Sequence, residues 1–284
     1  GRRDLLLEEM GIAPLWRLRE RSAAAKDVAS ADPQFPIEGD NAAARQAILE
    51  ESREASGPVQ RAAAEASEPN AGRSEPALQT AGDGDARRSR ILRMDWSALK
   101  SEVAQCRACP LNEKRTQTVF GVGDESADWM FVGEGPGAEE DAKGEPFVGQ
   151  AGRLLDSMLA AIDLERGHDV YIANVVKCRP PNNRNPEHRE MSCCEPYLAR
   201  QIELIQPRLI VALGRISANH LLQSDATIAS LRGRVHRYRG TPLIVTYHPA
   251  YLLRSLQEKA KAWVDLCFAR ETMESLRAGR SVLP

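Results

Sequence analysis

The sequence contains no long hydrophobic run. None of its apolar stretches approaches the roughly 20 residues that a membrane-spanning helix needs, and the N-terminal residues lack the pattern of a secretory signal. We therefore expect a cytoplasmic protein without a membrane partner. Cysteines in that compartment serve as metal ligands or free thiols more often than as disulfides, and the chain has 6 of them.

A strong net charge is also absent, since the formal charge is −2 over 284 residues. The balance hides an asymmetry along the chain. Residues 124–169 carry 12 acidic and 3 basic side chains, whereas residues 177–254 carry 5 acidic and 12 basic ones. A nearly neutral protein with a basic half can bind a polyanion such as nucleic acid. A solvated arginine surface is the alternative that charge alone leaves open.

Residues 20–90 have too few apolar side chains to form a core. They are rich in Ala, Ser, Gly, Glu and Arg, as in SGPVQRAAAEASEPNAG, and such a composition buries too little surface to offset the entropy of ordering. We predict a flexible linker there. Residues 1–19 differ, because RRDLLLEEMGIAPLWRLR carries a short apolar pattern between arginines. This segment is interpreted as a docking peptide or as a helix that packs on the chain's own domain.

From residue 91 to residue 284, apolar blocks alternate with helical patterns and Gly/Pro punctuation. Strands are expected at DWMFVGE, DVYIANVVKC, PRLIVALG and TPLIVTYHP. The alternation predicts one α/β domain with a parallel four-stranded sheet and helices on both faces. Ligands of such sheets bind outside the carboxyl ends of the strands. The loops expected to form the site are those after Val132, Val176, Leu213 and Tyr247.

The loop at 131–152, FVGEGPGAEEDAKGEPFVGQAG, fits the dinucleotide fingerprint G-x-G-x-x-G/A from Gly133 to Ala138. A pyrophosphate requires open amides without competing charge, yet the acidic run 139–141 follows directly. We therefore expect a tight turn that brings carboxylates to a pocket. Phe147, surrounded by small residues, suits stacking on a planar ring, although a place in the core fits the sequence equally well.

Five of the cysteines are candidate metal ligands. They are Cys106, Cys109, Cys178, Cys193 and Cys194. Four thiolates can bind Zn²⁺ or a [4Fe–4S] cluster, and their spacing alone does not choose between the two. Neighbouring cysteines cannot readily both be ligands, so one of the adjacent pair is extra. Cys267 lies in a helical apolar pattern and is expected in the core.

Four long motifs occur in order along the domain: GEGPGAEEDAKGEPFVGQAG, YIANVVKCRPPNNRNP, CEPYLARQIELIQPRLIVALG and TYHPAYLLR. Together they resemble the motifs of family 4 uracil-DNA glycosylases, the iron–sulfur branch of that superfamily, from about Cys106 to the final helix. The resemblance implies a uracil-DNA glycosylase-like fold. It also implies a monomer that flips uracil from single- or double-stranded DNA. Hydrolysis of the N-glycosidic bond would leave an abasic site for base excision repair.

The resemblance assigns roles to residues of the expected site. Phe147 would stack on uracil, and Asn174 would pair with the uracil edge, since an amide offers both a donor and an acceptor. His248 would donate a hydrogen bond to uracil O2 as negative charge develops there. Glu134 would orient water or stabilise the sugar cation.

Two further residues would complete the uracil pocket by the same resemblance. One is Gly135, where Ala is usual in the family, and the other is Glu140, close to uracil C5, where bulk would exclude the methyl group of thymine. Other residues would contact DNA, by wedging into the base stack or by binding phosphates. These are Tyr251, Leu252, Leu253, Arg254 and Lys177.

The resemblance also selects ligands for a [4Fe–4S] cluster with a structural role. They are Cys106, Cys109, Cys178 and Cys194, the last because it precedes Glu-Pro-Tyr-Leu, as the family's last ligand precedes x-P-Y-L. The N-terminal peptide, residues 2–19, is similar to the peptide of the DNA polymerase III psi subunit that binds the chi subunit. It would then tether the enzyme to chi through the linker.

Two other functions stay open at this point. One is an oxidoreductase that binds a nucleotide cofactor in the glycine loop, which NAD(P)H binding would reveal. The other is a DNA-binding protein without catalysis, which DNA affinity without base release would reveal.

Overall fold

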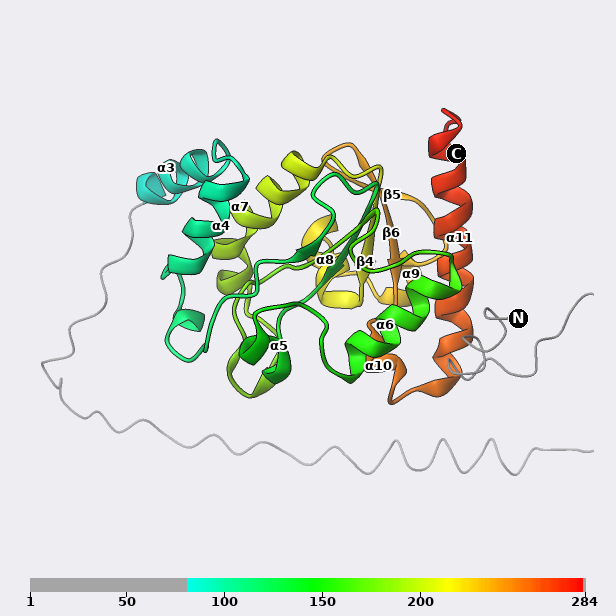
Figure 1. The fold of residues 1–284 in the computed structure, drawn as a ribbon, viewed down its shortest axis with the longest axis horizontal. Helices are drawn as coiled ribbons and strands as arrows, with labels where there is room; N and C mark the ends of the chain where they lie inside the picture. Colours follow the sequence, from blue (N-terminus) through cyan, green and yellow to red (C-terminus); the bar gives the residue numbers. More distant parts are fainter. Residues whose placement is uncertain (1–80, 283–284) are drawn as a thin grey trace, which may run out of the picture. The chain divides into compact units, whose positions relative to one another are not determined.

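The computed structural model describes residues 81–282, which form an α/β arrangement (Figure 1). The expected docking peptide, 1–19, and residues 20–80 of the expected linker lie outside the described residues. The predicted flexible linker needs correction at its end, because residues 81–90 belong to helix α3 (Ala81–Ile91). The physical reason is that Arg88 forms an ion pair with Glu195 and Arg87 donates a hydrogen bond to the Cys193 carbonyl.

A six-stranded sheet in the order β1-β3-β2-β4-β6-β5 forms the centre of the domain. The four inner strands pair in parallel, which confirms the predicted parallel sheet. They are β2 (Trp129–Gly133), β3 (Val170–Asn174), β4 (Leu209–Leu213) and β6 (Thr241–Thr246).

Two edge strands, β1 (Val122–Gly123) and β5 (His236–Tyr238), pair antiparallel with the inner strands. The sheet is therefore mixed, whereas the sequence predicted only the four parallel strands. With two and three residues, the edge strands are too short to leave a hydrophobic period in the sequence.

Every residue of β2, β3 and β4 is buried, which explains why these strands read as continuous apolar runs. Successive residues point to opposite faces of the sheet. Accordingly, Met130 and Val132 belong to one cluster of buried side chains and Phe131 to the other. The core is therefore divided into two layers by the sheet.

Helices cover both faces of the sheet, as predicted (Figure 1). Buried side chains of α3, α4 (Trp96–Gln105), α7 (His188–Ile205) and α8 (Arg215–Leu222) join the first cluster. Those of α6 (Gln150–Ala161) and α11 (Lys259–Arg277) join the second. Asp95 is the N-cap of α4, since its carboxylate accepts a hydrogen bond from the Ala98 amide at 2.8 Å.

Short helical segments lie in the loops between these elements. They are η1 (Pro110–Asn112), α5 (Ala138–Lys143), η2 (Pro181–Asn183), α9 (Ile228–Leu231), α10 (Pro249–Leu252) and η3 (Leu256–Glu258). Within residues 81–282, no helix has both the length and the apolar character needed to cross a membrane.

Candidate active site

A cleft of about 700 Å³ opens beyond the carboxyl ends of the four parallel strands. Each of the four loops predicted to form the site contributes to its wall. Representative lining residues from the loops after β2, β3, β4 and β6 are Glu134, Pro180, Gly214 and His248. Because parallel strands end at the same edge of a sheet, residues far apart in the sequence meet in one place.

The cleft brings together most of the residues predicted for uracil and DNA. Those that line it are Glu134, Gly135, Glu140, Phe147, Asn174, His248, Tyr251 and Arg254. Other lining residues were not predicted from the sequence, among them Arg184, Arg215, Ile228 and Tyr247. Tyr247 directly precedes a predicted site residue, and Arg215 begins the helix after a predicted site loop. The position of both residues in the sequence could therefore have identified them.

Phe147 is held in an uncommon backbone conformation, with φ at +56°. The Arg166 guanidinium donates hydrogen bonds to the carbonyl oxygens of Pro146 and Phe147, at 3.0 and 2.9 Å. Gly152 lets the backbone of α6 approach the backbone of Phe147 closely, because a Cβ at position 152 would lie 1.8 Å from the Phe147 carbonyl oxygen. A left-handed conformation of a bulky residue persists where the surroundings fix it, and these contacts do so.

Gly133, at the end of β2, leaves room for two side chains of the cleft. A Cβ at this position would lie 2.5 Å from Asn174 Oδ1 and 2.6 Å from the tip of the Phe147 ring. Asn174 itself is 2% exposed, and its Oδ1 has no hydrogen-bond donor among the described residues. Buried acceptors are normally satisfied, so an unpaired one at a cleft marks a place for a ligand's N–H group.

The imidazole of His248 faces the same cleft. Its Nδ1 accepts a hydrogen bond from the Ala250 amide at 3.1 Å, which leaves the proton of the neutral ring on Nε2. Burial, assisted by the nearby Arg254 cation, lowers the pKa of His248 to about 4. The ring is therefore a neutral N–H donor at physiological pH.

The two carboxylates of the cleft differ in their surroundings. Burial raises the pKa of Glu134 above its ordinary value. Glu140 accepts three backbone hydrogen bonds, from Gly137 at 3.0 Å, Val148 at 2.9 Å and Gly149 at 3.2 Å. Glu140 therefore ties the start of α5 to the loop that carries Phe147.

Two residues predicted to contact DNA lie in the interior, which corrects that expectation. Lys177 is 1% exposed, and its ammonium donates to the Asn174 carbonyl at 2.8 Å and to Gln201 Oε1 at 2.6 Å. A basic residue in a basic stretch suggests a phosphate contact, but this one fixes the end of β3. Leu252 is fully buried because the turn of α10 points it inward, whereas Tyr251 and Leu253 are 40% and 39% exposed.

A second, much smaller cavity is lined by five cysteines, namely Cys106, Cys109, Cys178, Cys193 and Cys194. Nitrogen donors point at three of the sulfur atoms: Arg87 at Cys106 (3.8 Å), Arg115 at Cys178 (3.0 Å) and the Lys177 amide at Cys194 (3.3 Å). Burial raises the pKa of the Cys109 thiol to about 11 and that of Cys194 to about 12. Across residues 81–282, no group of three or more His, Cys, Asp or Glu side chains is arranged to hold a metal ion.

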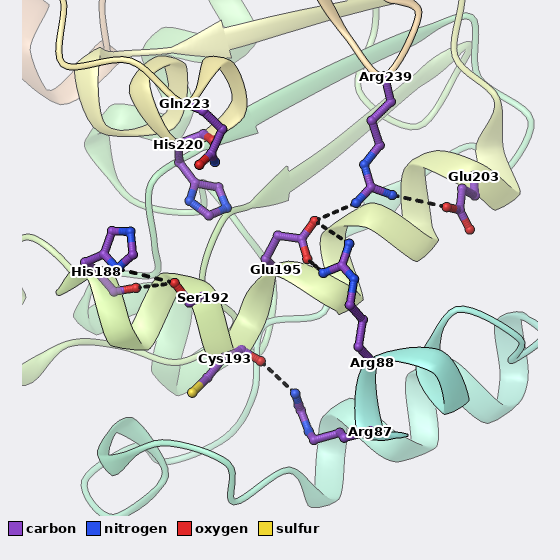
Figure 2. A network of polar contacts seen from close by, with 10 residues as sticks. All are labelled: Arg87, Arg88, His188, Ser192, Cys193, Glu195, Glu203, His220, Gln223 and Arg239. Carbon is purple, nitrogen blue, oxygen red and sulfur yellow. Dashed lines mark hydrogen bonds and ion pairs between the residues drawn. The ribbon is translucent and has the colours of Figure 1, made fainter. Parts of the chain in front are cut away.

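Helix α3 is anchored beside this cysteine cavity by its arginines (Figure 2). Arg88 forms an ion pair with Glu195 of α7, and Arg239 reaches the same carboxylate at 3.0 Å. Arg87 donates to the Cys193 carbonyl at 3.0 Å. These contacts explain why the chain is already helical before the expected start of the domain.

The sequence profile of the Uracil DNA glycosylase superfamily matches residues 120–269, which hold the cleft loops described above. The chain belongs to this superfamily. It is 48% identical over 160 residues to the type-4 uracil-DNA glycosylase of Archaeoglobus fulgidus, which covers 54% of this chain and 80% of the relative. The resemblance to family 4 is thereby confirmed.

Other type-4 uracil-DNA glycosylases are similar to nearly the same degree. The enzyme of Thermotoga maritima is 46% identical over 159 residues, covering 55% of this chain and 82% of the relative. A type-5 uracil-DNA glycosylase of Pyrobaculum aerophilum is more distant, at 31% identity over 146 residues, covering 46% and 64%. The matched domain thus resembles the type-4 enzymes more closely than the type-5 enzyme.

Proposed function

We propose that this protein is a uracil-DNA glycosylase that hydrolyses the N-glycosidic bond of uracil in DNA. The observation that carries the proposal is the unpaired, buried Oδ1 of Asn174 beside the Phe147 ring in a cleft that also contains a neutral histidine. A flat ring with an N–H beside a carbonyl fits this set of groups. The names of the type-4 relatives point to the same substrate.

The base is recognised by stacking and by pairing. Uracil flipped from the helix stacks on Phe147, and its N3–H donates to Asn174 Oδ1, the acceptor that otherwise lacks a donor. The amide nitrogen of Asn174 donates to uracil O4 in return. Extrusion of the base costs a few kcal/mol, which these contacts and the surface around Tyr251 and Arg254 offset.

The chemical step is helped at both ends of the breaking bond. Negative charge that develops on uracil O2 is stabilised by a hydrogen bond from the Nε2–H of His248. The imidazole is neutral when it donates this bond, because its pKa is lowered by burial. The carboxylate of Glu134 stabilises the cationic sugar or orients the attacking water. Lys177, the lysine of the β3 loop, is buried and engaged away from the cleft, so we assign no Schiff-base step and infer a monofunctional enzyme.

Cysteines 106, 109, 178 and 194 would hold a [4Fe–4S] cluster. The four side chains are not arranged around a single metal ion, but they line one cavity. Three of their sulfur atoms receive N–H hydrogen bonds, as the ligands of iron–sulfur clusters do. When bound, the cluster would cross-link the loop after β3 to the loop after α4. Cys194→Ala should abolish the brown chromophore and the bound iron, whereas Cys193→Ala, the matched control, should retain both.

The activity is tested with an oligonucleotide that contains one uracil, incubated with the protein and then treated with alkali. We expect strand cleavage at uracil only after alkali, and none in the same oligonucleotide with thymine. Cleavage without alkali would contradict a monofunctional enzyme. DNA binding without any cleavage would leave a DNA-binding protein instead of a glycosylase.

A further inference from the structure

Arg232 and Asp265 form a buried ion pair directly behind the last loop of the cleft. The guanidinium, at the end of α9, donates from Nε and Nη2 to the two oxygens of the Asp265 carboxylate on α11, at 2.6 and 2.9 Å. The side chains are 14% and 1% exposed. Bidentate geometry makes this pair both strong and directional, and the pair is not required by the proposed chemistry.

The same two residues hold the end of β6. Thr246, the last residue of that strand, donates its hydroxyl to Asp265 Oδ2 at 2.7 Å. The Arg232 guanidinium lies over the ring of Tyr247, 4.7 Å from its centroid. Two consecutive residues that lead into the cleft loop are therefore fixed by one buried pair.

The contact continues to the surface of the protein. The ring of Tyr247 stacks on that of Tyr251 with centroids 5.5 Å apart and planes at 18°. Tyr251 is 40% exposed and lines the mouth of the cleft. A continuous stack thus runs from a buried charge pair to an exposed aromatic side chain on a short helical turn.

We infer that Arg232 and Asp265 are positioning residues for the turn at 249–254, which they hold in register to enter the base stack of double-stranded DNA. This inference rests on the proposed function. An apolar or aromatic wedge must be rigid to unstack base pairs. A single strand has no pair to open, so its uracil reaches the cleft without the wedge.

The dependence on a paired strand supplies the test. Specificity constants are measured for one uracil-containing oligonucleotide, alone and annealed to its complement. The main variant is Arg232→Leu combined with Asp265→Asn, which leaves no unpaired buried charge and keeps an acceptor for Thr246. Arg208→Ala is the control, because Arg208 pairs with Asp128 at the amino ends of β4 and β2. The cleft lies beyond the other ends of these strands.

We expect the double variant to lose about tenfold more activity on the duplex than on the single strand, which corresponds to about 1.4 kcal/mol. Tyr251→Ala should show the same selective loss. Adding it to the double variant should cost little more, because coupled residues are not additive. Equal losses on both substrates, or none, would overturn the inference.

Arg232→Lys keeps the positive charge but loses the planar guanidinium that binds Asp265 with two nitrogens. This variant tests the inference if the double variant does not fold. An unchanged ratio of duplex to single-strand activity in Arg232→Lys would then overturn the inference. Failure of the proposed function gives a different result, since the wild-type protein would release uracil from neither substrate.

Discussion

The ring of Phe147 lies 5.5 Å from the imidazole of His248, centroid to centroid, with the two planes at 31°. The rings come from the loops after β2 and β6, which are far apart in the sequence. Their tilt places an aromatic stacking surface next to an N–H donor. In the proposed function, stacking and stabilisation of the leaving base therefore act on one flipped ring.

The space beside these rings depends on Gly133. In Gly133→Ala, the new methyl group would overlap both the Phe147 ring and Asn174 Oδ1, so one of them must move. We expect at least about a 100-fold loss in the rate of uracil release, as misplacement by an ångström can cause. Single-turnover kinetics at saturating protein would measure it.

The control for this variant is Gly84→Ala, because a Cβ at Gly84 has no atom within 4 Å. The control should match wild type in rate. A Gly133→Ala protein of normal activity would show that Phe147 and Asn174 do not need the positions described here.

Arg166 fixes the Phe147 loop from outside the cleft through two carbonyl groups. Removing it in Arg166→Ala leaves the left-handed backbone less constrained, and we expect the half-saturating DNA concentration to rise about tenfold. Asp156→Ala is the comparison, since Asp156 pairs with Arg166 at 2.8 Å but is not a partner of the loop. An effect of Asp156→Ala as large as that of Arg166→Ala would contradict the role of the two carbonyl bonds.

His248 should make the stability of the protein depend on pH. Its pKa is about 4 in the folded protein against roughly 6.5 in an unfolded chain, so the unfolded chain takes up the proton first as the pH falls. The stabilising contribution is complete above pH 6.5 and is lost towards pH 4. Between pH 7.5 and pH 5, wild type should lose about 2 kcal/mol of unfolding free energy relative to His248→Gln. The unfolding free energies are measured by denaturation at each pH. If they change with pH equally in the two proteins, the histidine has an ordinary pKa.

Arg87 should protect the proposed cluster, because its guanidinium lies over the Tyr197 ring and points at Cys106. In Arg87→Ala we expect faster bleaching of the brown chromophore in air, measured by visible absorbance. Arg90→Ala removes only an exposed pair with Glu102 and is the matched control. Equal bleaching rates in the two variants would argue against shielding by α3.

The strands that could be predicted from the sequence are those whose two faces are both buried. The strands ending at Gly133, Asn174, Leu213 and Thr246 are continuous apolar runs, and their loops were expected to form the site. The edge strands β1 and β5 were missed because they are short and their pairing depends on neighbouring strands. Helix α3 was missed because its contacts with α7 are to residues distant in the sequence, an ion pair of Arg88 and a hydrogen bond of Arg87, which leave no local pattern.

The site could be predicted only in part, for similar reasons. Phe147, Asn174 and His248 lie in recognisable motifs, and all three line the cleft. Lys177 and Leu252 stand in the same motifs but point inward, because side-chain direction depends on the turn that carries each residue. The Arg232–Asp265 pair joins segments that are distant in the sequence, so only the folded structure brings it into view.

Recognition of uracil by the cleft is tested at Asn174. Free uracil should be quantified after incubation of wild type and Asn174→Ala with an oligonucleotide bearing one uracil, beside its thymine counterpart. We expect wild type to release uracil but no thymine, and a folded Asn174→Ala protein to lose that release. Undiminished release by Asn174→Ala would contradict the claim that this cleft recognises the base.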